Sequence, residues 1–186
     1  KIILLKNSAR KTRRWYVYCD KYHSNCSGER KMLKRLILGL GLILASSTHA
    51  QFYKQGNLVT DLEQGIIWLR CSLGQRWDPT TEQCQGEAMR LSHAEIDQAI
   101  LQANEQLGGE WRLPTLAELE GILCLECPAP KIDTEVFPNT ASEPYWTSEA
   151  NWIAPRSRWS VSFMTGLKYG RFFPQQQLAA RLVSDR

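Results

Sequence analysis

Aromatic and arginine side chains alternate between residues 152 and 171, near the end of the chain. Planar aromatic rings stack on sugar rings, and a guanidinium binds a carboxylate or sulfate through two parallel hydrogen bonds. The competing interpretation is that alternate residues of short strands form core and that the arginines are merely solvated. The residues that we predict to bind a ligand are Trp152, Arg156, Arg158, Tyr169 and Arg171.

Four cysteines between residues 71 and 127 are an even set, which suits disulfide bonding in an exported chain. Cys71 and Cys84 enclose a turn-rich loop, and closing it would stabilise the fold by roughly 3 kcal/mol. Cys124 and Cys127 form a C-x-x-C motif, which exchanges disulfides when one thiol has a lowered pKa. Because the motif follows a predicted helix end, the helix dipole disfavours a thiolate there. We favour Cys71–Cys84 and Cys124–Cys127 disulfides, with the crossed pairings open and a thiol-dependent enzyme as the alternative.

Other catalytic or metal-binding patterns are missing from the sequence after residue 50. Its one histidine, His93, lies inside a helix-capping motif and is interpreted as a surface residue at a helix start. One histidine and paired thiols do not make a transition-metal site. Sugar-binding C-type lectins usually carry a Glu-Pro-Asn or Gln-Pro-Asp triplet and a Trp-Asn-Asp triplet. Here Glu143-Pro144 is followed by Tyr145, and Asn151-Trp152 is followed by Ile153, so neither triplet is complete. We therefore predict no enzyme activity, no cofactor and no metal.

Two helices and several strands must position these side chains. Ser92 with Glu95, and Thr115 with Glu118, form capping boxes that predict helices ending near residues 107 and 123. Arg112, just before the second helix, is predicted to anchor the loop after that helix. Short strands are predicted at 58–61, 65–70, 145–149, 159–163, 167–173 and 180–184, with a long loop at 128–144. Two helices early and short antiparallel strands with long loops in the second half indicate an α+β fold.

Five sequence blocks recur in an order typical of one family. They are Gly65-Ile66-Ile67-Trp68-Leu69-Arg70, Gly109-Glu110-Trp111-Arg112-Leu113-Pro114, Phe137-Pro138-Asn139-Thr140, Tyr145-Trp146-Thr147-Ser148 and Arg181-Leu182-Val183. Over roughly residues 56 to 184 the chain resembles the Legionella collagen-like adhesin C-terminal (Lcl C-terminal) domain family. The resemblance implies a C-type-lectin-like fold and a location outside the cytoplasm more firmly than any activity.

The N-terminal 50 residues read as targeting sequence rather than domain. Met32-Leu33-Lys34-Arg35, the apolar residues 36–45 and the small residues 46–50 predict a signal peptide at 32–50, cleaved near Ala50. Ten apolar residues are too few to span a bilayer, which needs about 20. Residues 1–31 are interpreted as a mis-called upstream segment, which leaves residues 51–186 as the Lcl C-terminal-like domain.

Charge separates these two parts of the chain. The whole chain is formally +4. Residues 51–186 hold 12 Lys and Arg against 17 Asp and Glu, and residues 1–50 hold 11 against 2. The predicted mature domain is therefore acidic, at −5, and no general attraction to nucleic acid is expected.

We predict an exported, periplasmic or secreted, non-catalytic domain for binding or adhesion, with a glycan or an envelope component as its partner. A structural envelope protein without a small ligand is a third interpretation.

Overall fold

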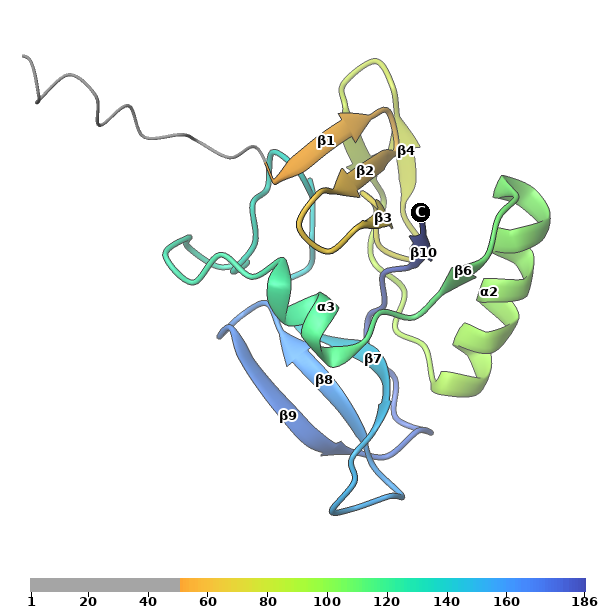
Figure 1. The fold of residues 1–186 in the computed structure, drawn as a ribbon, viewed down its shortest axis with the longest axis vertical. Coiled ribbons are helices and arrows are strands. Elements are labelled where there is room, and N and C mark those ends of the chain that lie inside the picture. The colour runs from red at the N-terminus through yellow and green to blue at the C-terminus, as the bar shows by residue number, and fades with distance from the viewer. Residues whose placement is uncertain (1–50) are drawn as a thin grey trace, which may run out of the picture. The chain divides into compact units, whose positions relative to one another are not determined.

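The computed structural model describes residues 51–186 (Figure 1). The predicted signal peptide at 32–50 and the segment 1–31 lie outside the described residues. Among residues 51–186, neither helix has the length and apolar character needed to cross a bilayer.

The largest sheet has five antiparallel strands and is completed by the end of the chain. Its order is β1 (Phe52–Gln55), β2 (Leu58–Asp61), β3 (Ile66–Leu69), β10 (Val183–Asp185) and β6 (Trp111–Arg112). The β2–β3 turn is closed by Asp61, whose Oδ1 accepts hydrogen bonds from the backbone N–H groups of Glu63 and Gln64 at 2.9 and 3.1 Å. Gly65 ends this turn at φ 71°, a conformation that favours glycine.

Two smaller sheets complete the strand content. β4 (Arg76–Asp78) and β5 (Gln83–Gln85) form a hairpin, and β7 (Pro144–Ala150), β8 (Arg158–Ser162) and β9 (Leu167–Phe172) form a three-stranded antiparallel sheet. Figure 1 shows this last sheet below the others, with α3 between it and the five-stranded sheet. The predicted Cys71–Cys84 disulfide is confirmed, and it fastens the β4–β5 hairpin to the end of β3.

Both predicted helices are present, and each begins with its predicted capping box. α2 (His93–Leu107) is capped by Ser92 and α3 (Leu116–Gly121) by Thr115, with the glutamate three residues on bonding back to the cap. α2 buries only Ile96 completely, and it lies at one side of the domain (Figure 1).

The predicted α+β, C-type-lectin-like fold is wrong. The described residues are mostly β, with ten strands in three sheets and two short helices, and nothing in them indicates a lectin-like arrangement. Five strands precede α2, so the helices are not the early part of the domain. The error has a physical origin, because capping boxes mark helices clearly in a sequence whereas strands of two or three residues are too short to show alternation.

Two arginines are buried among the apolar residues of the core. Arg181 is completely buried, and its guanidinium donates to the carbonyl oxygens of Leu69 and Arg70 and to the hydroxyls of Ser72 and Thr140. Its guanidinium carbon also lies 4.8 Å from the ring centre of Phe137.

Arg70 is the second buried arginine. It donates to the carbonyl oxygens of Gly56, Glu135 and Val136 at 2.8–2.9 Å, and its guanidinium lies over the Trp77 ring. These contacts replace the water that the buried cations give up.

Candidate binding surface

All five predicted ligand-binding residues belong to the three-stranded sheet or to one of its loops. Trp152 and Arg156 lie in the β7–β8 loop at residues 151–157, Arg158 begins β8, and Tyr169 and Arg171 lie in β9. Trp152, Arg156, Tyr169 and Arg171 are exposed, and Arg158 is half-buried. The sheet therefore gathers residues that are up to 19 positions apart in the sequence.

The β7–β8 loop is held in a fixed shape by Asn151. The Asn151 backbone N–H donates to the Ser157 carbonyl at 2.9 Å, and the Asn151 Oδ1 accepts from the Ile153 N–H at 3.0 Å. Its Nδ2 donates to the Gly170 carbonyl at 2.8 Å, which fastens the loop to β9. Trp152, 81% exposed, and Ile153, 72% exposed, are therefore held in solvent by an ordered backbone.

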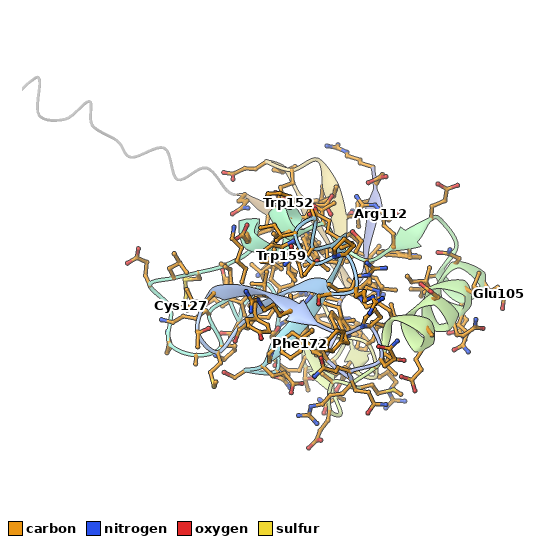
Figure 2. The ribbon with its side chains drawn as sticks, turned by 90° about the horizontal axis from the view of Figure 1, so that it is seen from below. Glu105, Arg112, Cys127, Trp152, Trp159 and Phe172 are labelled. Atoms are coloured by element: carbon orange, nitrogen blue, oxygen red, sulfur yellow. A yellow bond between two sulfur atoms is a disulfide. The ribbon has the colours of Figure 1, made fainter. Side chains whose placement is uncertain are left out.

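Arg158 and Tyr169 share one face of the sheet. Residues directly opposite each other in an antiparallel pair point to the same side, and Arg158 is paired with Phe172. The Phe172 and Tyr169 rings are in edge contact, with centres 5.0 Å apart. Trp159 packs on the other side of the sheet against Gly170, where a Cβ atom would come within 2.6 Å of the indole ring. Figure 2 labels Trp152, Trp159 and Phe172 on this part of the molecule.

From the Tyr169 and Phe172 rings, a row of ring contacts continues into the core, which the sequence did not predict. Phe172 contacts the fully buried Trp146, with ring centres 5.9 Å apart, and Trp146 contacts His93 at 4.7 Å. His93 is therefore packed against the core and is not the simple surface residue that its capping motif suggested.

The surface is cationic although the domain is acidic. Residues 144–173 contain Arg156, Arg158, Lys168 and Arg171 but only one acidic residue, Glu149. Lys168 pairs with Glu120 of α3 at 3.0 Å. Within residues 51–186 none of the three arginines forms an ion pair. Three guanidinium groups thus remain free to bind an anion.

The positive charge of Arg158 also affects the pKa of His93. Burial lowers the pKa of the His93 imidazole below its ordinary value, and the nearby Arg158 lowers it further, while Asp97 acts in the opposite direction. The Nε2 atom of His93 is buried without a hydrogen-bond partner among the described residues. Burial and Arg158 together favour the neutral imidazole next to the cationic surface.

The C-x-x-C motif lies away from this row of rings, in the loop after α3. The structure joins Cys124 to Cys127. Lys131 clasps the loop, because its ammonium donates to the carbonyl oxygens of Leu125 and Cys127 at 3.0 and 2.7 Å. In the described part of the chain there is no group of three or more metal-ligating side chains.

Arg112 connects three elements, which differs from its predicted role of anchoring the loop after α3. Its guanidinium makes a two-pronged ion pair with Glu118 at 2.8 and 2.9 Å and a second ion pair with Asp185 at 2.6 Å. Arg112 lies in β6, Glu118 in the first turn of α3, and Asp185 in β10. Carbonyl oxygens or a carboxylate of the loop after α3 were the expected partners, whereas the two carboxylates that Arg112 contacts come from α3 and β10.

These features define a mostly β, disulfide-bonded domain that presents a cationic aromatic surface. A model of the Lcl C-terminal domain family matches residues 57–184, so the chain belongs to that family. Searches of the curated proteins and of the solved structures found no match. Membership is consistent with a binding or adhesin-type domain, and the two disulfides suit an oxidising, extracytoplasmic compartment.

Proposed function

We propose that this protein is an exported, non-catalytic binding domain that holds a small anionic or sugar-like group on the surface of the β7–β8–β9 sheet. One observation carries the proposal. Three arginines without ion-pair partners in residues 51–186 are gathered with exposed aromatic rings on a single sheet of an otherwise acidic domain.

The chemistry of the surface explains its preference. A guanidinium offers two parallel donors that match the oxygens of a carboxylate or sulfate, and Tyr169 and Trp152 offer ring faces on which a sugar can stack. Because this surface holds only three arginines without an ion pair among residues 51–186, only a few ligand charges are neutralised there. Affinity should therefore fall only modestly with salt, unlike the steep loss seen for long polyanions.

Alanine substitution tests the surface directly. In a glycan array that includes carboxylated and sulfated sugars, followed by calorimetry on the best ligand, Arg158→Ala combined with Arg171→Ala should weaken binding about tenfold or more. Thermal stability should change little, because neither arginine lies in the core or forms an ion pair within residues 51–186, and substitutions away from such features usually alter it by under about 0.5 kcal/mol. Lys54→Ala, which removes an exposed cation from β1, is the matched control and should bind normally.

Three results would count against the proposal. Unfolding of the double variant would show that Arg158 and Arg171 are needed for the fold, so the ligand site would lie elsewhere. Unchanged affinity in a folded double variant would move the ligand to another surface. An array with no bound glycan would favour a structural envelope protein.

Export is the second part of the proposal. It is supported by the two disulfides, which persist in oxidising compartments, and by the signal-like residues 32–50. N-terminal sequencing of the protein from its host should begin at or near Gln51. Recovery of a chain that retains residues 1–31 would exclude both the cleavage and the mis-called start. Titration of free thiols on the same material should find none, whereas reactive thiols at Cys124 and Cys127 would favour the enzymatic alternative.

A further inference from the structure

A groove of about 740 Å³ lies between α2 and the chain that follows β3, away from the cationic sheet. One wall is the face of α2 that carries Gln98, Gln102 and Gln106, with Ala99 and Ala103 beneath them. The other wall is formed by residues 71–77 together with Met89. The volume falls within the usual range of ligand-binding clefts, about 300–1,000 Å³.

The wall opposite α2 is rigid. Its backbone is fixed at Leu73, whose N–H donates to the Ala180 carbonyl and whose carbonyl accepts from the Met89 N–H, at 2.9 and 2.8 Å. Gly74 has φ +89° and packs so closely against Met89 that any Cβ would collide with it. The Cys71–Cys84 disulfide ties the same segment to the β4–β5 hairpin. A groove with fixed walls loses little conformational entropy when a ligand binds.

The groove is lined by uncharged polar groups. Gln98, Gln102 and Gln106 recur every four residues, about 6 Å apart along the helix. Within residues 51–186 these three side-chain amides form no hydrogen bond to another protein group, although they line the cleft. The walls carry two charged residues, Arg76 and Glu95, whose opposite charges cancel. The groove is therefore electrically neutral, in contrast to the cationic sheet.

Neutral amides and an aromatic ring identify a class of ligand. A primary amide both donates and accepts hydrogen bonds, as a sugar hydroxyl does. Trp77 adds a flat ring to the groove, and the Arg70 guanidinium lies over this ring at 4.4 Å. We infer that the groove binds an uncharged oligosaccharide chain, whose hydroxyl groups pair with the row of glutamines along α2.

Alternative ligands fit these walls less well. A polyanion would meet no cluster of cations, since the one arginine on the walls is balanced by Glu95. An apolar helix would bury the glutamine amides without partners, at a cost for each unpaired group. An uncharged peptide remains the closest competitor, because backbone amides also donate and accept, and it is included in the test.

The test is calorimetric titration of the folded protein with uncharged hexasaccharides of three kinds: cellohexaose, maltohexaose and chitohexaose. At least one should bind with a Kd of about 1 mM or tighter. Gln98→Ala combined with Gln102→Ala should weaken that binding about tenfold or more. Both substitutions lie in α2, and they should leave the helix folded because alanine has the highest helix propensity.

Two control variants show whether the binding belongs to the groove. Gln55→Ala removes an exposed amide from β1, outside the groove, and should leave affinity unchanged. Arg158→Ala should also leave it unchanged, so failure of the cationic surface and failure of the groove can be told apart.

The inference is overturned if none of the three saccharides binds, or if the double glutamine variant binds as tightly as the parent protein. Binding of an uncharged Pro-Gln repeat peptide in place of every saccharide would assign the groove to polypeptide and would also overturn it.

Discussion

Replacing Arg181 by methionine tests how the core accommodates a buried cation. The substitution leaves the carbonyl oxygens of Leu69 and Arg70 without this donor, at about 1–3 kcal/mol each. The hydroxyls of Ser72 and Thr140 lose less, because each keeps another partner at 2.8 Å. Against this loss, burial lowers the pKa of Arg181 to about 10, so methionine relieves part of the cost of holding a cation in the core. We expect Arg181→Met to lower the free energy of unfolding by about 1–3 kcal/mol.

Urea denaturation of the parent and of two variants provides the measurement. Arg181→Ala should be about 2–5 kcal/mol less stable than Arg181→Met, because it also leaves a cavity, and this approaches the whole stability of a small domain. If the methionine variant is as stable as the parent or more stable, the carbonyl oxygens do not need the guanidinium. If alanine and methionine are equivalent, the site collapses around the missing side chain.

Three further outcomes follow from the same contacts. Because the pKa of His93 is lowered in the folded state, the unfolded chain binds a proton more readily, so stability should fall as pH drops below about 6.5. In urea denaturation curves, His93→Gln should abolish this loss of stability at low pH. Arg158→Ala should raise the pKa of His93 measured by NMR, and an unchanged pKa would contradict the proximity of Arg158 to His93. Arg112→Ala should lower the free energy of unfolding, measured in thermal melts, by about 1–2 kcal/mol. This is less than for a fully buried ion pair, because the Arg112 side chain is 34% exposed. An unchanged melting temperature together with lost binding would make Arg112 a ligand contact. Replacing Cys71 and Cys84 together by serine should cost about 3 kcal/mol, given the 13-residue separation, and equal stability would show that the loop is ordered without the bond.

The sequence was informative where a local signal encodes a local structure. The capping boxes at Ser92 and Thr115 depend on side chains three residues apart, so both helix starts could be read directly. The strand β6 has only two residues, Trp111 and Arg112, and it exists because β10 pairs with it from more than 70 positions away. No periodic pattern can report such a pairing, and this is why the fold class was wrong.

The candidate surface was predictable in composition but not in arrangement. Alternating arginines and aromatic residues near residues 152–171 stood out in the sequence. The contact between Phe172 and Trp146, and that between Trp146 and His93, depend on the register of β7, β8 and β9 and on the placement of α2. The groove went unnoticed for a similar reason, since a row of glutamines on a helix usually faces solvent and its opposite wall comes from another part of the chain.

The central position of β10 determines when this domain can form. β10 lies between β3 and β6, so both of those strands keep an open edge until residues 183–185 arrive. A ribosome or a translocation channel releases the chain from its N-terminus, and exposed edges invite pairing with other chains during that interval. The five-stranded sheet therefore cannot close before residues 183–185 are available, and deleting them should leave β1–β2–β3 as a three-stranded sheet and β6 without a paired neighbour.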